Sequence, residues 1–218
     1  MKNTLCYELH KLFNSMRRYT ADTIEEIPFK NGIYIFFQKG EKYGDMDRIV
    51  RVGTDTGKNQ LKSRMRQHLV KENKDRSIFR KNIGRALLSK RKDPLLDYWN
   101  IDFTTKENKQ TRYDAEKAAA CKAVEGEISA FMKETLSFVV FPVNTKEERL
   151  RLEKAIISTL YNSDDFKANT DWLGNYVPET GWTHVQSARM WLSQGLKAEP
   201  LTKEELEKIQ AACQQTDA

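Results

Sequence analysis

Four side chains in this sequence are of the types that enzymes use on anionic substrates: a phenol, a guanidinium, an imidazole and a carboxylate. They are Tyr34, Arg64, His68 and Glu153. A planar guanidinium can bind two oxygens of a phosphate at once, and fixed positive charge stabilises the charge that develops when a phosphodiester is attacked. A carboxylate among cations suits a hard divalent ion that keeps most of its waters. A phenol is a poor base at neutral pH unless nearby cations favour its ionised form.

Each of these residues also has an ordinary structural interpretation. Tyr34 could be a core aromatic of a strand, and His68 a surface histidine whose polar atoms are satisfied. Glu153 could form a surface ion pair with Lys154 or Arg149, a kind of pair that contributes little to stability. The combination therefore favours a functional site more strongly than any single residue does.

Two strands and two helices must position these side chains. Residues 31–37 and 48–54 are rich in β-branched and aromatic types and are separated by glycines and charges, so they predict a hairpin that carries Tyr34. A helix over residues 58–70 would place Arg64 and His68 on one face, four positions apart. A capping box at its start predicts a helix over residues 145–160, with Glu153 at the border of the apolar face.

The remaining pattern predicts a mixture of helices and strands. Apolar residues at three- and four-residue steps indicate helices, and short runs of aromatic and β-branched residues indicate strands. The predicted further helices cover residues 5–18, 77–88, 113–133, 185–192 and 201–213. The predicted further strands cover residues 98–103 and 138–143.

Positive charge is concentrated in one segment. The 218-residue chain has a formal net charge of +6, with 31% charged residues. Between residues 58 and 92, thirteen Lys or Arg face two acids, so the rest of the chain is acidic on balance. A charge run can be a solvated helix face, but this asymmetry favours contact with a phosphate backbone. The cations expected to bind nucleic acid are Arg51, Lys62, Arg66, Arg80, Lys81 and Arg85.

The cysteines and the apolar runs of the sequence indicate in which cellular compartment the protein is expected. The three cysteines, Cys6, Cys121 and Cys213, are odd in number and widely scattered. They indicate free thiols in a reducing compartment, and they share no zinc-site spacing with the histidines. The longest apolar run, residues 33–37, is too short to cross a membrane, and no signal peptide is visible. The expectation is a cytoplasmic protein with no membrane partner.

The order of the motifs resembles that of a known family. Gly32-Ile33-Tyr34 is followed by Arg51-Val52-Gly53, by Arg64 and His68 with three residues between them, and by Glu153 in a late helix. This succession resembles the GIY-YIG nucleases over about residues 28–175. Residues 48–54, 77–80, 84–88 and 172–174 are similar to a poorly characterised branch in which Arg stands in the second motif.

The resemblance implies an α+β fold: a small mixed sheet of about three to five strands flanked by helices. Residues 1–27 would be an N-terminal helix and connector, 28–176 the nuclease core, and 177–218 a helical extension packed on that core. It also implies a metal-dependent endonuclease with one Mg²⁺ or Mn²⁺ per site. DNA is the expected substrate, RNA remains an alternative, and cutting both strands would be easiest for a homodimer.

The resemblance further implies a role for each matched residue. Tyr34 would be the general base or would orient the attacking water, and Arg64 would hold the scissile phosphate. His68 would assist with the phosphate or the proton, and Glu153 would be the single protein ligand of the metal. The family's late asparagine would fall on Asn169. Its alternative position is Asn175.

One residue departs from the family pattern. Arg51 stands where the family name has its second tyrosine, and a guanidinium stays protonated, so it cannot share the base role. That role would rest on Tyr34, on His68 or on water activated by the metal. Arg51 either binds phosphate or marks a degenerate site. Two hypotheses follow: a DNA endonuclease, or a nucleic-acid-binding module with a nuclease-derived fold and no cleavage.

Overall fold

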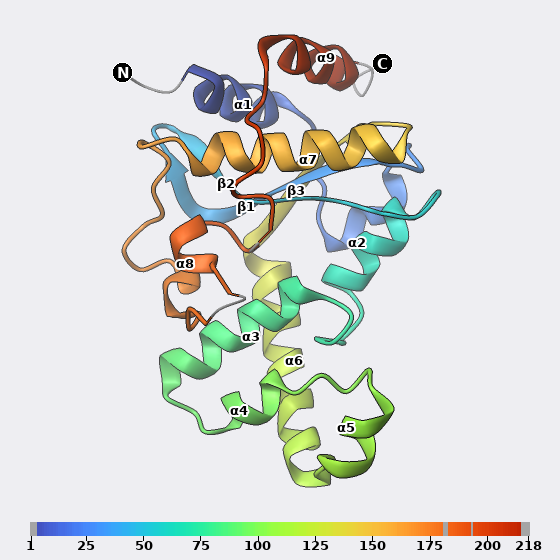
Figure 1. Ribbon diagram of the computed structural model, residues 1–218, viewed down its shortest axis with the longest axis vertical. Helices are drawn as coiled ribbons and strands as arrows, with labels where there is room; N and C mark the ends of the chain where they lie inside the picture. The colour runs from blue at the N-terminus through green and yellow to red at the C-terminus, as the bar shows by residue number, and fades with distance from the viewer. Residues whose placement is uncertain (1–3, 181–182, 193, 215–218) are drawn as a thin grey trace.

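A three-stranded sheet lies between two layers of helices in the computed structural model, which describes residues 4–180, 183–192 and 194–214 (Figure 1). The strands are β1 (Gly32–Tyr43), β2 (Met46–Thr54) and β3 (Leu136–Pro142), in the order β2-β1-β3. The α+β class and a sheet flanked by helices are confirmed. Both pairings are antiparallel, so the described sheet is antiparallel rather than mixed.

The hairpin register decides which residues face each other near the predicted site. Gly44 takes a positive φ in the turn between β1 and β2, a conformation that glycine adopts without steric cost. Tyr34 then pairs with Gly53, and Phe36 pairs with Arg51. On the other side of β1, Tyr34 pairs with Val140 of β3. Because β1 is the central strand, its residues 32–38 are all buried.

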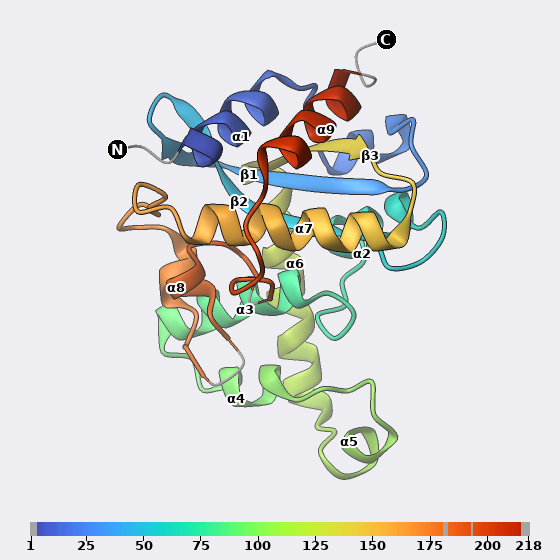
Figure 2. The same cartoon turned by 45° about the horizontal axis from the view of Figure 1, so that its top comes forward.

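The alternation of side chains along β1 divides the core into two halves. Ile33, Ile35 and Phe37 face one helical layer, and Tyr34 and Phe36 face the other. The first layer consists of α1 (Thr4–Ser15), α7 (Lys146–Tyr161) and α9 (Lys203–Gln214), and Figure 2 shows α1 and α9 next to each other. The second consists mainly of α2 (Leu61–Leu69), α3 (Ile78–Arg91) and α6 (Ala115–Thr135).

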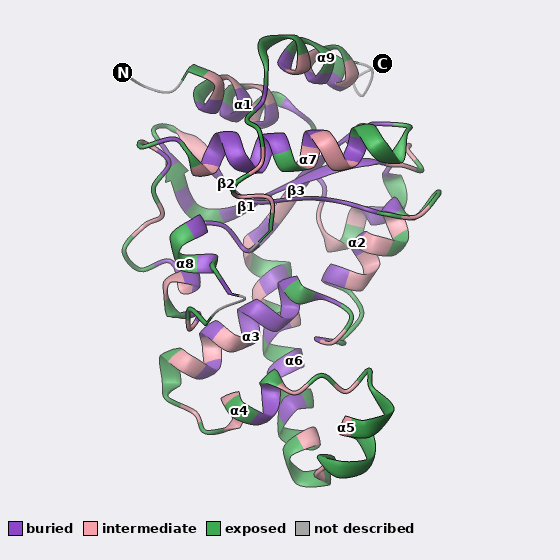
Figure 3. Cartoon of the chain, in the orientation of Figure 1, coloured by how far each residue is buried: buried purple, intermediate pink, exposed green. Residues whose placement is uncertain are grey.

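The second layer extends into a lobe that points away from the sheet (Figure 1). It is formed by α4 (Leu95–Asn100), α5 (Lys106–Thr111) and the first half of α6. No residue of α5 is buried, and Figure 3 shows this helix exposed where the sheet is buried. The short elements are η1 (Ala21–Glu26), η2 (Leu173–Tyr176) and α8 (Val185–Ala188).

The strand predicted over residues 98–103 is wrong, because the first part of this segment belongs to α4. Asp93 begins the helix by accepting a hydrogen bond from the Leu95 amide at 2.9 Å, and Pro94 stands at the cap position. Trp99 is buried, and its indole donates to the Lys81 carbonyl at 2.9 Å. A Cβ at Gly84 would overlap the Trp99 ring. The aromatic residues therefore pack α4 on α3 and do not belong to a sheet.

The other predicted elements are confirmed with shifted ends. The predicted helix over 58–70 begins only at Leu61, since Asn59 has a positive φ. The predicted helix over 185–192 ends at Ala188, and the chain then runs along β2, where the Trp191 amide donates to the Val50 carbonyl at 2.7 Å. Cys6, Cys121 and Cys213 are buried, and none of these three described cysteines forms a disulfide. Among the described helices, none has the length and apolar character needed to cross a bilayer.

His10 gives the folded protein a predicted sensitivity to acid. It is fully buried; its Nδ1 lies 2.8 Å from the Cys6 carbonyl, and its Nε2 accepts from the Ile49 amide at 3.2 Å. Burial lowers its pKa to about 4, against the backbone hydrogen bond, which raises it. Because the unfolded chain takes up the proton near pH 6.5, stability from this group is full above that pH and is lost toward pH 4, by about 3 kcal/mol.

Urea unfolding measured at pH 7 and pH 5 checks this prediction. The wild type should lose stability over this interval, and His10→Gln should lose less of it. His184→Gln, a change at an exposed histidine, is the control and should follow the wild type. A His10→Gln protein with the wild-type pH dependence would contradict the assignment.

Candidate active site

A hydrogen-bonded chain of three side chains lies at the start of the sheet, on the α2 and α3 side. The Tyr34 hydroxyl lies 3.0 Å from Nε2 of His68, and Nδ1 of His68 lies 2.7 Å from Oγ of Ser77. Ser77 is the N-cap of α3, where its Oγ accepts from the Arg80 amide at 3.3 Å. Strand β1, helix α2 and the start of α3 therefore converge on one buried polar cluster.

Gly53 makes room for the tyrosine of this cluster. It pairs with Tyr34 across the hairpin, and a Cβ at this position would overlap the end of the Tyr34 ring, including its hydroxyl oxygen. The Tyr34 side chain therefore lies directly over the backbone of Gly53. The glycine of the second motif is thus needed for the placement of the tyrosine of the first.

Gly53→Ala is expected to destabilise the fold by about 2 kcal/mol or more, because the added methyl overpacks the site and displaces Tyr34. Gly126→Ala is the matched control, since a Cβ there meets no atom within 4 Å in the middle of α6. It should stabilise the protein by about 0.5–1 kcal/mol through helix propensity. Chemical denaturation of both variants is the measurement, and equal effects would contradict the overlap.

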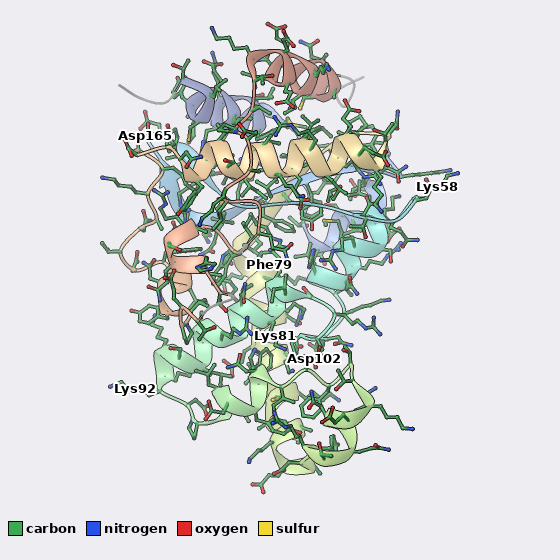
Figure 4. The ribbon with its side chains drawn as sticks, in the orientation of Figure 1. Lys58, Phe79, Lys81, Lys92, Asp102 and Asp165 are labelled. Atoms are coloured by element: carbon green, nitrogen blue, oxygen red, sulfur yellow. The ribbon has the colours of Figure 1, made fainter. Side chains whose placement is uncertain are left out.

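Arg51, predicted to bind nucleic acid, is buried beside Tyr34 and directs its polar atoms into the protein. It is 5% exposed. Its guanidinium donates to the Trp191 carbonyl and lies over the ring of Phe79, 4.8 Å from the centroid. Figure 4 shows Phe79 inside the molecule, between α3 and the sheet. Burial lowers the pKa of Arg51, while its interaction with Tyr34 raises it. The residue that replaces the second tyrosine is thus an internal cation.

His68 is held neutral by its surroundings. It is fully buried, and burial is the main reason why its pKa lies well below the usual value. The positive charges of Arg51, Arg64 and Arg80 lower the pKa further. The imidazole can therefore exchange hydrogen bonds with Tyr34 and Ser77, but it does not supply a positive charge to the site at neutral pH.

Arg64 connects the buried cluster to a hollow of about 450 Å³. Its Nη1 donates to the Gln67 side chain and to the Arg76 carbonyl, the latter at 3.3 Å, and the side chain is half-buried. Its charge acts on both Arg51 and His68. The hollow is lined by Thr54, Asp55, Thr56, Gly57, Gln60, Ser63, Arg64 and Gln67. A guanidinium thus faces a space that can admit a ligand.

Glu153, on α7, contacts Thr54, a residue that lines this hollow. Its Oε1 accepts from the amide of Thr54 at 3.2 Å. Burial raises the pKa of Glu153, and the charge of Arg51 is the largest influence in the opposite direction. Among the described residues, no hydrogen bond to Oε2 is formed. A single carboxylate with one oxygen committed and one available fits a hard divalent ion that completes its coordination with water and substrate oxygens.

Asn169 does not join these residues. Its side chain donates to the Gly40 carbonyl at 2.8 Å, and its amide donates to Glu41 at 3.3 Å, near the end of β1 opposite Tyr34. Six residues of extended strand between Tyr34 and Gly40 span roughly 20 Å. Asn175, the alternative, donates to the Asn169 carbonyl and lies in the same loop. Both asparagines thus order this segment, and the structure does not place Asn169 with the other residues predicted to be catalytic.

Three cations predicted to bind nucleic acid are bound within the fold. Arg80 is fully buried and pairs with Glu125 at 2.6 Å. Lys81 pairs with Asp75 at 3.1 Å, and Arg85 donates to Asn82 and Asn100. Lys62 and Arg66 of α2 remain partly exposed, although Lys62 donates to the Glu25 carbonyl and Arg66 pairs with the Glu25 carboxylate. The basic face near the hollow is therefore smaller than the sequence indicates.

Three contributors to the site escape sequence reasoning. Ser77 is recognisable as a helix cap, but its contact with His68 requires the fold. Trp191 contributes through its main-chain carbonyl, and Thr54 contributes through its amide. Backbone groups carry no side-chain signal, so no residue pattern could have identified these two.

Comparison with known proteins gives one match. A family model described as GIY-YIG domain matches residues 4–218. No curated protein and no solved structure matches the chain.

Proposed function

The chain belongs to the GIY-YIG family, a family of nucleases that hydrolyse phosphodiester bonds, and from this premise we propose that it is a metal-dependent DNA endonuclease. One observation carries the proposal: Tyr34, Arg51, Arg64, His68 and Glu153, from four different elements, form one interacting cluster, and Arg64 of this cluster lines the hollow. Residues that are distant in the sequence thus bring a phenol, cations and a carboxylate together. Hydrolysis of a phosphodiester needs such fixed charges, because they stabilise the charge that develops in the transition state.

In the proposed reaction each side chain has one task. Arg64, at the wall of the hollow, binds the scissile phosphate and offsets the negative charge that develops on its oxygens. Tyr34 takes the proton of the attacking water or orients that water. His68 stays neutral and fixes the Tyr34 oxygen through their 3.0 Å hydrogen bond. Arg51, buried beside Tyr34, supplies a fixed positive charge at this end of the cluster.

Glu153 would hold one Mg²⁺ or Mn²⁺ through the oxygen that accepts no hydrogen bond in the described chain. When bound, the ion polarises the phosphoryl group and stabilises the departing 3′ oxygen. The amide of Thr54 holds the carboxylate of Glu153 beside a residue that lines the hollow.

The exposed side of α2 is the proposed contact for the phosphate backbone. Lys62 and Arg66 flank Arg64 on this helix. Replacing both with Ala should weaken DNA binding about tenfold at moderate salt, and it should reduce the slope of log K against log salt by about 2, because two phosphate contacts are lost. Lys106→Ala with Lys109→Ala, on the distant helix α5, is the charge-matched control. Binding titrations at several salt concentrations make the comparison, and equal losses in both double variants would contradict this surface.

One observation favours the alternative function, a binding module without cleavage. Tyr34 is 1% exposed, so its hydroxyl faces His68 and Arg51 rather than solvent. Incubating plasmid DNA and, separately, RNA with the protein and Mg²⁺ or Mn²⁺ decides between the two. The nuclease proposal requires cleavage that EDTA abolishes. Binding without metal-dependent cleavage of either polymer would establish the module, and cleavage of RNA alone would replace DNA as the substrate.

A further inference from the structure

We infer that Ser77 is a positioning residue that turns the ring of His68 so that its Nε2–H points at the oxygen of Tyr34. This inference deepens the proposed nuclease function and rests on it. It concerns the direction of the hydrogen bonds in the chain from Ser77 through His68 to Tyr34, in which Ser77 is the donor end and Tyr34 the acceptor end.

Burial makes the direction of these bonds matter. Ser77 and His68 are fully buried and Tyr34 is 1% exposed, so water cannot satisfy their polar hydrogens. The hydroxyl of Ser77, the neutral imidazole and the phenol carry three polar hydrogens between them. Only two hydrogen bonds join the three groups. One hydrogen is therefore in surplus, and it lies at whichever end of the chain does not donate inward.

The surroundings of the two ends are different. At Ser77, Oγ already accepts from the Arg80 amide, and a donated Nδ1–H would leave the serine hydrogen without an acceptor in the described surroundings. At Tyr34, the surplus hydrogen is the phenolic one, which also has no acceptor among the described residues, but it is the proton that the proposed base must lose. Only at this end does the proposed reaction remove the surplus hydrogen. A buried hydroxyl hydrogen without an acceptor is costly. The favoured direction therefore has Ser77 donating to Nδ1 and Nε2–H donating to Tyr34.

Ionisation of Tyr34 completes this arrangement. The phenolate oxygen then accepts from Nε2–H and faces the guanidinium of Arg51, whose Nε has no hydrogen-bond partner among the described residues. The proton that Tyr34 loses passes to solvent, and no hydrogen in the chain remains without an acceptor. Ser77 thus prepares an anion-binding position at Tyr34 without touching substrate.

The tautomer of His68 can be measured without any cleavage assay. In protein labelled with ¹⁵N-histidine, two-bond couplings distinguish Nε2–H from Nδ1–H, and His68→Gln identifies the His68 signals. His68 should carry its hydrogen on Nε2. His10 is an internal reference of the opposite kind, because its Nδ1 faces the Cys6 carbonyl and its Nε2 accepts from the Ile49 amide. An Nδ1–H tautomer at His68 in the wild type would overturn the inference, whether or not the protein cleaves DNA.

Cleavage rates test the consequence for activity. Ser77→Ala should lower the rate constant about 10- to 100-fold, the usual cost of removing a group that orients a catalytic one. Ser77→Thr, which keeps the hydroxyl, should restore most of it. Thr105→Ala removes an N-cap of the same type from α5 and should leave the rate unchanged. A Ser77→Thr variant as slow as Ser77→Ala would overturn the inference. If His68 shows Nε2–H but the wild type does not cleave, the nuclease proposal fails and the assigned direction of the hydrogen bonds stands.

Discussion

Glu153→Gln is expected to lower metal-dependent cleavage by at least about 10³-fold while leaving the fold intact. Glutamine has nearly the same shape and can still accept the hydrogen bond from Thr54, so the change removes the charge and little else. A metal ion supplies several kcal/mol of transition-state stabilisation, and about 1.4 kcal/mol corresponds to a factor of ten. Single-turnover cleavage with Mg²⁺ or Mn²⁺ measures the loss, and a thermal melt verifies folding.

The matched control for this prediction lies on the same helix. Glu147 is exposed in the first turn of α7, and Glu147→Gln should retain the wild-type rate. A Glu153→Gln protein that keeps more than about a tenth of the activity would show that the carboxylate does not hold the metal. In that case another oxygen at the hollow would have to do so.

Tyr34→Phe is expected to slow cleavage by about 10²- to 10⁴-fold, the usual range for the loss of a general base. The ring of phenylalanine still fits over Gly53, so the packing of the hairpin is kept. The variant also leaves Nε2 of His68 without its hydrogen-bond partner, and an unsatisfied buried polar atom lowers the free energy of unfolding. The rate is measured under saturating metal so that any effect on metal affinity is excluded.

Tyr43→Phe controls for the removal of a hydrogen-bonded tyrosine hydroxyl. Tyr43 is also buried, and its hydroxyl donates to Asp165 at 2.7 Å in the far part of β1. This variant should cleave at the wild-type rate. Comparable losses in the two phenylalanine variants would mean that both act through stability, and Tyr34 would then have no special part in the reaction.

Much of the fold can be predicted from the sequence because apolar residues recur at the spacing that buries one face of a helix or strand. The hairpin, the strand near residue 140 and the long helices follow from this period, and Leu61, Met65 and Leu69 are buried as predicted. The strand predicted at residues 98–103 failed because aromatic residues suit a strand and a helix–helix contact equally well. Only the fit of Trp99 against Gly84 distinguishes the two.

The candidate site was predictable where a side chain has a recognisable type and spacing. Tyr34, Arg64, His68 and Glu153 could be selected in this way, and the fold brings them together. The cations of α3 could not be sorted, because sequence alone does not reveal that Glu125 of a different helix meets Arg80 inside the protein. Charge is visible in a sequence, but the partner that neutralises it is visible only in the fold.

The bond between Arg51 and the Trp191 carbonyl also affects when the site is complete. A ribosome delivers Tyr34 and Arg51 early and residue 191 late, and domains generally fold as units once their chain has emerged. Until then the guanidinium has neither its carbonyl partner nor the cover of that segment. An emerging polypeptide that already carries all the motif residues is therefore expected to be inert toward nucleic acid strands nearby, including its own messenger, until residue 191 has also emerged.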